Sequence, residues 1–162
     1  MSSSNVFIDR DLGYHRVVDG LADMRGRATL VGIHEEEGAA IHPADATGTG
    51  PTLAVIAFTN EMGSKDGVVP ERPFMRGAVD ANSRTYGDRL QAAAEAAVDG
   101  TATLETSTAR LGLLVEGDIK AYMTDLQDPP NAPITIARKG SSNPLIDTGR
   151  LRASIRAEQE LA

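Results

Sequence analysis

The fold is decided by residues 73–126, which read PFMRGAVDANSRTYGDRLQAAAEAAVDGTATLETSTARLGLLVEGDIKAYMTDL. Apolar residues recur there at helical spacing on both sides of Gly100. They are Val79, Tyr86, Leu90, Ala93 and Ala97 before the glycine, and Leu104, Leu111, Val115, Ile119, Tyr122 and Leu126 after it. Pro73 suits the first position of a helix, and Asp128-Pro129-Pro130 stops the second one. The stretch therefore predicts two long helices that pack as an antiparallel hairpin.

The chain before this hairpin predicts a smaller set of elements. Residues 10–24 have the spacing of an amphipathic helix, and residues 28–34 are rich in β-branched residues, as strands are. Residues 35–51 begin with three Glu and continue with Gly and Pro, a composition that predicts an irregular arm. Residues 52–62 fit a buried strand or a helix, and Thr52 as N-cap with Gly63 after the last turn favours the helix.

The chain after the hairpin predicts an extended stretch over residues 133–137 and a basic segment over residues 134–156. No element is assigned to the residues after Ile155. Together the patterns predict a single α+β domain over residues 1–162. We expect the long helical hairpin and the N-terminal helix to pack on a small β-sheet, with extended loops and arms.

Composition restricts the classes of function. The formal net charge is −7, which argues against a general nucleic-acid binder. Residues 134–156 nevertheless hold five cations, Arg138, Lys139, Arg150, Arg152 and Arg156, against the single carboxylate of Asp147. This basic segment on an acidic chain fits either docking to another protein or a solvated turn. The chain has no Cys, and the sequence predicts neither a signal peptide nor a membrane span.

Residues with catalytic potential do not form a recognisable set. His34-Glu35-Glu36-Glu37 with His42 is the strongest metal-like pattern, but Gly38 stands where a zinc protease helix needs its second His. The glycines at 48–50 and 63–67 lack the spacing of a phosphate-binding loop. The sequence therefore predicts no enzyme activity, no metal and no cofactor.

The run Leu145-Ile146-Asp147-Thr148-Gly149-Arg150-Leu151 allows three interpretations. An Asp-Thr-Gly triplet occurs in retroviral-type aspartic proteases, where each loop sits in a β-barrel and two carboxylates share a proton. Only thirteen residues follow Gly149, too few for the strands of such a barrel. Alternatively, Asp147 or Thr148 caps a short helix that carries Leu151 and Ile155. The third interpretation comes from a family resemblance.

Two parts of the chain together resemble the tail-completion, or virion-morphogenesis, neck proteins of tailed phages and Mu-like prophages. The first part is Ala57-Phe58-Thr59-Asn60-Glu61-Met62-Gly63, followed after a variable loop by Pro70-Glu71-Arg72-Pro73-Phe74-Met75-Arg76. The second is the stretch from Thr135 to Ile155 with its Leu-Ile-Asp-Thr-Gly string. The order and separation of these motifs match the family pattern across most of residues 52–156, although Met62 replaces the usual aromatic residue.

The resemblance implies a structural virion protein that forms a ring, often a hexamer, at the head–tail junction. Its implied partners are itself, the portal or connector, and tail terminator or collar proteins, with DNA passing through the lumen without specific binding. It implies assembly in the host cytoplasm and a place in the neck of the virion. The residues expected at interfaces are Glu61, Gly63, Arg72, Pro73, Phe74, Arg76, Arg138, Lys139, Asp147, Thr148, Gly149, Arg150, Leu151 and Arg152. The alternatives are a small phage-encoded hydrolase or aspartic-type protease, and a tail terminator or collar adaptor.

Overall fold

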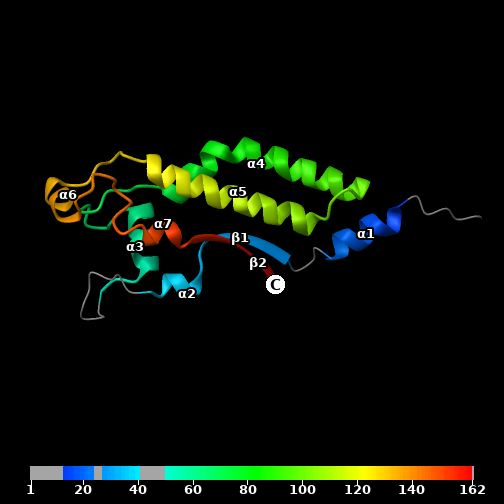
Figure 1. Cartoon of the computed structure of the whole chain (residues 1–162), viewed down its shortest axis with the longest axis horizontal. Coiled ribbons are helices and arrows are strands. Elements are labelled where there is room, and N and C mark those ends of the chain that lie inside the picture. Colours follow the sequence, from blue (N-terminus) through cyan, green and yellow to red (C-terminus); the bar gives the residue numbers. More distant parts are fainter. Residues whose placement is uncertain (1–12, 24–26, 41–49, 162) are drawn as a thin grey trace, which may run out of the picture.

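The computed structural model describes residues 13–23, 27–40 and 50–161. These residues form mixed helix and strand, with a long helical hairpin above a two-stranded antiparallel sheet (Figure 1). In chain order the elements are α1 (Tyr14–Asp23), β1 (Arg27–Ile33), α2 (Glu35–Gly38), α3 (Leu53–Met62), α4 (Phe74–Asp99), α5 (Leu104–Asp125), α6 (Pro133–Lys139), α7 (Arg150–Ala153) and β2 (Ile155–Leu161). The predicted α+β class is therefore confirmed.

The hairpin of α4 and α5 forms where the sequence predicts it. Gly100 ends α4 in the left-handed conformation with φ of 69°, which a residue without a Cβ adopts at little cost. Thr103 then starts α5, and its hydroxyl accepts the N–H of Thr106 at 3.1 Å. Farther along, the Tyr86 hydroxyl donates to the Asp118 carboxylate at 2.8 Å and ties the two helices together.

The sheet pairs a strand from the early part of the chain with the last strand. β1 and β2 pair antiparallel over their whole length, from Arg27 opposite Leu161 to Ile33 opposite Ile155. α5 lies against one face of this sheet, and Gly112 of α5 lets the helix approach closely. A Cβ at that position would lie 2.7 Å from a Thr29 methyl carbon and 3.2 Å from the Ala157 Cβ. The sheet is therefore held against the hairpin at a glycine.

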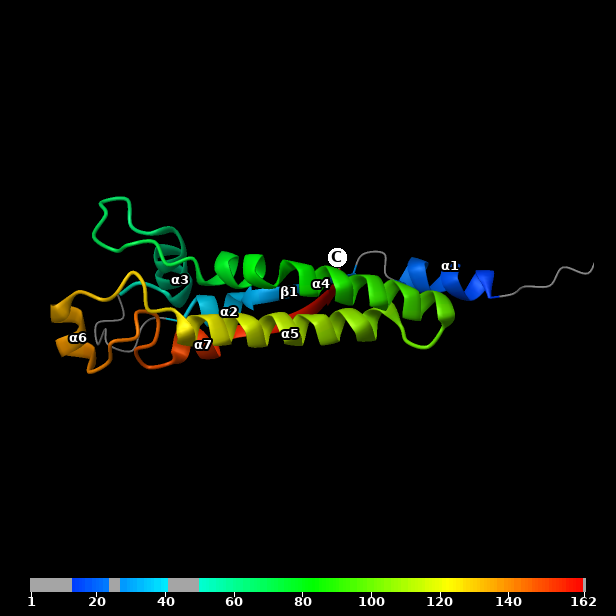
Figure 2. The same ribbon diagram turned by 90° about the horizontal axis from the view of Figure 1, so that it is seen from above.

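The two ends of the molecule differ in what they carry. Seen from above, α1 lies beyond one end of the hairpin, while α3 and α6 lie at the other (Figure 2). We call the latter the α3–α6 end. The fully buried side chains Phe74, Met123 and Ile155 form the centre of the core together with α3 residues. No helix in the described part of the chain has the length and apolar composition that crossing a membrane requires.

Several predicted elements are confirmed, and one is wrong. Residues 52–62 form the helix α3, capped by the Thr52 hydroxyl, and Gly63 follows it with φ of 73°. Within the predicted arm, Glu35–Gly38 form one helical turn, while residues 41–49 lie outside the described residues. Residues 133–139 are not extended but form α6, because Pro133 fits the first turn of a helix and Gly140 supplies a left-handed C-cap.

We predict that Gly112→Ala weakens the protein. The new methyl group would collide with β1 and β2, and overpacking of this kind costs about 1–3 kcal/mol. Gly117→Ala is the matched control in the same helix, where a Cβ meets nothing within 4 Å. It should stabilise the protein by about 0.4–1 kcal/mol. Urea denaturation measures both values, and equal effects of the two substitutions would contradict the close packing of sheet and helix.

We also predict that Tyr86 controls stability at high pH. Burial and then the Asp118 carboxylate raise the pKa of Tyr86 well above its ordinary value. As the pH rises past about 10, the unfolded chain loses this proton first, so the free energy of unfolding falls. Denaturation between about pH 8 and 11 should show a smaller fall for Tyr86→Phe than for the native protein. Tyr14→Phe removes an exposed phenol instead and should keep the native pH dependence.

Candidate functional site

The two motif-bearing parts of the chain meet at the α3–α6 end, and Arg72 of the first part bonds to the loop that leads from α5 to the second part. Arg72 is 4% exposed, and its backbone N–H donates to the Asn60 carbonyl at 2.7 Å. The guanidinium donates to the carbonyls of Pro129 at 2.8 Å and Pro130 at 3.1 Å. Burial lowers the pKa of Arg72. Because these carbonyls follow α5 and Arg72 precedes α4, one side chain fixes both ends of the hairpin.

Glu61 organises the start of α4. Its two carboxylate oxygens accept the backbone N–H groups of Met75 at 2.9 Å and Arg76 at 3.0 Å. Pro73 occupies the N-cap position without a capping side chain, so the carboxylate from α3 performs that role. The Arg76 guanidinium contacts the carboxylates of Glu71 and Glu61, which raise the pKa of Arg76. The Asn-Glu and Pro-x-Arg-Pro-Phe motifs thus form an internal clasp between α3 and α4.

Asn143 organises the loop that follows α6. Its side-chain oxygen accepts the N–H groups of Leu145 and Ile146, both at 2.9 Å, and its amide donates to the Thr124 carbonyl at 2.9 Å. The Lys139 ammonium donates to the Asn143 carbonyl at 3.1 Å. Burial lowers the pKa of Lys139, and the nearby Asp147 carboxylate opposes that effect. These bonds hold the loop against the end of α5.

The Asp147-Thr148-Gly149 triplet leads into α7. The N-cap position of α7 is taken by Gly149, in the left-handed conformation with φ of 78°, and not by Asp147 or Thr148. Asp147 and Thr148 are exposed just before it. Ile155 is also not part of this helix but begins β2. The described residues form a two-stranded sheet rather than the barrel that an aspartic protease needs.

A small cavity of about 150 Å³ lies between α3 and this turn. Leu53, Ile56 and Asn60 of α3 line it from one side, and the stretch from Pro144 to Leu151 lines the other, with Lys139 at its edge. The structure therefore brings most of the predicted interface residues to one end of the molecule. Arg72, Phe74 and Leu151 are buried inside the chain, however, so their side chains support this end rather than contact a partner.

The five cations of the basic segment do not form one surface. Arg138 and Arg150 are exposed at the α3–α6 end, and Arg152 donates to the Lys120 carbonyl at 3.2 Å. Arg156 instead lies on β2 and contacts the carboxylates of Glu37 and Glu158. Arg156 thus lies apart from the other cations of the basic segment, and its position on β2 turns it toward the acidic α2.

His34 does not belong to a metal centre in the described residues. Its two ring nitrogens lie 3.1 Å from the Glu158 carboxylate and 3.0 Å from the Arg156 carbonyl. Across residues 13–23, 27–40 and 50–161, no group of three or more His, Asp or Glu side chains could hold a metal ion. His42, the second half of the predicted pattern, lies outside these residues.

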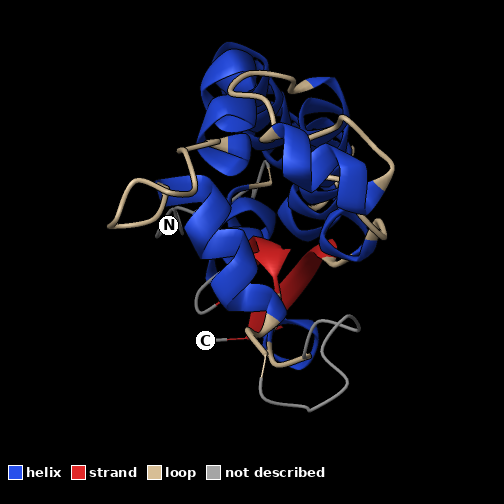
Figure 3. Ribbon diagram, turned by 90° about the vertical axis from the view of Figure 1, so that its left-hand side faces the viewer, coloured by secondary structure: helices blue, strands red, loops and turns tan. Residues whose placement is uncertain are grey.

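One functional feature of this end was missed from the sequence. Val55, Phe58 and Met62 lie on one face of α3 and are 52%, 68% and 51% exposed, and we call them the α3 stripe. Leu53 and Ala57 of the same helix are buried in the core. A helix that is apolar on both faces is buried on both faces or lacks a partner on one. The apolar composition of both faces of α3 was the sequence signal that could have revealed this stripe. Figure 3 looks directly at this end of the molecule.

Two further apolar side chains are strongly exposed in the described part of the chain. Val68, in the loop between α3 and α4, is 76% exposed, and Ile134 of α6 is 81% exposed. Such side chains scattered singly are ordinary on protein surfaces, whereas contiguous exposed apolar patches are found at interaction sites. No protein-family model, curated protein or solved structure matches this chain. The family resemblance drawn from the motifs therefore stays a prediction.

We predict that Arg72→Lys destabilises the protein by about 2–4 kcal/mol, because an ammonium cannot reproduce the fork of donors to two carbonyls and leaves buried acceptors unpaired. Arg76→Lys is the matched control on the exposed side of the clasp and should cost at most about 1 kcal/mol. Chemical denaturation of both variants measures the difference. A loss for Arg72→Lys no larger than for Arg76→Lys would contradict the role of Arg72 as the joint.

Proposed function

We propose that this protein is a structural component of the neck of a tailed phage, where it forms a ring at the head–tail junction. The single observation that carries the proposal is the α3 stripe, a large apolar helix face without a partner among the described residues. It lies in the motif-bearing part of the chain that resembles the neck-protein family. A protein that works by docking needs such a surface more than it needs a catalytic cleft.

The energetics of the stripe suit a docking role. Full burial of a side chain such as Phe58 or Met62 contributes about 1.5–3 kcal/mol. Aromatic and Met side chains are also enriched at the centres of protein interfaces. The clasp formed by Glu61, Arg72 and Arg76 holds the helix in place, so little conformational entropy is lost on docking.

Charge supports the same role. Arg138, Arg150 and Arg152 lie in the motif-bearing half of a chain whose net charge is −7. Cations at the rim of an apolar contact guide association with carboxylates on a neighbouring ring and affect its rate more than its strength. The acidic remainder suits a ring through which DNA slides, because like charges do not bind.

The ring follows from the kind of contact. A stripe at one end of a subunit that docks on a different surface of its neighbour makes a heterologous interface, and such an interface produces a cyclic ring when the rotation between neighbours closes. The same stripe would serve a tail terminator or a collar adaptor, which also stack as rings. The portal or connector and the tail terminator are the proposed neighbours.

We predict that Phe58→Glu blocks head–tail joining while the protein stays folded. A carboxylate at the centre of the docking surface costs far more than the lost apolar contact, because it would be buried without a partner. The measurement is complementation of a phage lacking the gene, with electron microscopy to count separate heads and tails. We expect a fall in infectious particles of about a hundredfold, on the scale of about 3 kcal/mol.

Thr85→Glu is the matched control, because Thr85 is exposed on α4 away from the α3 stripe. It adds the same charge and should leave joining unchanged. Circular dichroism of both variants verifies the fold. Normal joining with Phe58→Glu would refute the docking role of the stripe, and normal virions without the gene would refute the neck function itself.

A further inference from the structure

The two outer edges of the β1–β2 sheet differ, because a side chain of α5 bonds to the backbone at one edge only. At the β2 edge, the backbone N–H of Ala157 donates to the Glu116 carboxylate of α5 at 2.8 Å. Lys120, 2.6 Å from Glu116, lowers the pKa of that carboxyl group and the Ala157 N–H lowers it further. A side chain of α5 thus occupies the edge of β2 and leaves no room for another strand at that point.

The contact at Ala157 also fixes the direction of the backbone groups of β1. The N–H of Ala157 points away from β1, so Ala157 and its partner Val31 form a non-hydrogen-bonded pair. The N–H and C=O of Val31 therefore point away from β2, and alternation gives the same direction to Thr29 and Ile33. Within the described part of the chain, no group bonds to these three residues along that edge.

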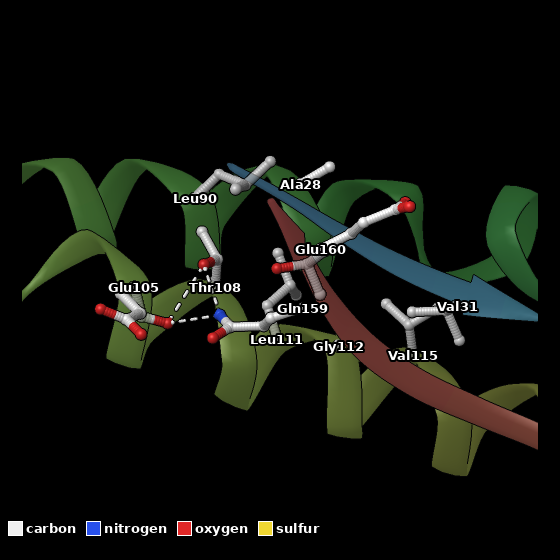
Figure 4. Close-up of a pocket in the computed structure, with 11 residues that line it drawn as sticks. Ala28, Val31, Leu90, Glu105, Thr108, Leu111, Gly112, Val115, Gln159 and Glu160 are labelled. Carbon is white, nitrogen blue, oxygen red and sulfur yellow. Dashed lines mark hydrogen bonds between the residues drawn. The ribbon is translucent and has the colours of Figure 1, made fainter. Parts of the chain in front are cut away.

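An apolar groove lies between the sheet and the hairpin. Its volume is about 490 Å³, and Leu90 of α4, Leu111 and Val115 of α5, and Ala28 and Val31 of β1 line it (Figure 4). Leu90 is half exposed there. On the opposite face of the sheet, Leu30 is 43% exposed. An added strand would meet apolar side chains on both of its faces.

The edge of β1 carries none of the features that keep sheet edges apart. Residues 28–33, Ala-Thr-Leu-Val-Gly-Ile, contain no charge and no Pro, and the pairing with β2 contains no bulge. Proteins that keep an edge free use charges, Pro or bulges to block pairing with other chains. An uncharged open edge beside an apolar groove therefore indicates a surface that is covered by a strand.

We propose that a second copy of this chain supplies that strand and that its residues 5–9 pair with β1. This inference rests on the proposed ring and names the contact between its subunits. The sequence Asn5-Val6-Phe7-Ile8-Asp9 has the required chemistry: three β-prone apolar residues between two polar ones. In an extended strand, Val6 and Ile8 face one way and Phe7 the other. The side chains on one face of this strand enter the groove, and those on the other face contact Leu30.

Chain length explains why the donor is a second copy. Three residues lie between Asp9 and Gly13, so these two residues are at most about 13 Å apart when the chain is extended. α1 has ten residues and is about 15 Å long. Its first residue lies at the end away from β1 (Figure 1). Residues 5–9 therefore cannot return along α1 to the β1 edge of their own chain, whereas the β1 edge of a neighbour is free to receive them.

Amide hydrogen exchange of the full-length protein tests the contact at single residues. In dilute protein, the amides of Leu30 and Gly32 are protected by β2, and those of Thr29, Val31 and Ile33 exchange freely. In concentrated protein, where light scattering shows a larger mass, the three outward amides should exchange at least about tenfold more slowly. Their protection in the single chain, or free exchange in the associated form, would overturn the proposal. So would a protein that stays a single chain at every concentration.

Paired substitutions identify the donor and the acceptor. Val6→Asp with Ile8→Asp should abolish both the association and the slow exchange, whereas Ser2→Asp with Ser4→Asp adds the same charge and should change neither. Thr29→Pro removes one outward N–H and should act like the first pair, while Thr29→Val keeps that N–H and should associate normally. Exchange at Leu30 and Gly32 reports whether each variant retains its sheet.

The outcomes separate this proposal from the neck function. If the Val6 and Ile8 double variant still associates and still slows the outward amides, residues 5–9 are not the donor and the proposal fails. If this variant no longer associates but still joins heads to tails normally, the strand contact is real. In that case the contact has no part in the proposed head–tail joining. If Phe58→Glu blocks joining while amide exchange never changes, the neck function stands and the strand contact is refuted.

Discussion

The buried guanidinium of Arg72 is the contact on which the rest of the structure depends. It lies within the chain between the loop before α4 and the loop after α5, which are 57 residues apart in the sequence. Two proline carbonyls accept its N–H groups, so charge-assisted hydrogen bonds offset the cost of burying the charge. The hairpin would keep its helices without this contact, but it would lose the bonds between the loop before α4 and the loop after α5.

The clasp around Arg72 explains why the α3–α6 end presents an apolar helix face. Leu53 and Ala57 bury one side of α3 in the core, and the Glu61 carboxylate fixes its last turn to the start of α4. α3 therefore cannot rotate to hide Val55, Phe58 and Met62. The polar motif residues act mainly inside the chain, and the surface that they support is apolar. The same residues that suggest a family by their pattern thus serve the fold first.

In the sheet, one edge is covered by the chain itself and the other is not. α5 covers one face of both strands and closes the edge of β2 through Glu116. Only two strands are present in the described residues, and none of those residues bonds to the outward backbone groups of β1. Small sheets of this kind are marginal alone and gain stability from a third strand. The α3 stripe and the β1 edge lie on different parts of the molecule, as two contacts in a ring would.

The sequence by itself determined the helices, because their signals are local. The spacing of apolar residues, Thr52 and Gly100 located α3, α4 and α5 to within a residue or two. It failed at α6, where the helix signals of Pro133 and Gly140 were not used, and at the turn before α7, where the left-handed Gly149 takes the N-cap position. The burial of Arg72, the exposure of Phe58 and the open edge of β1 were decided only by the tertiary structure. Each depends on atoms tens of residues away, and no local pattern contains that information.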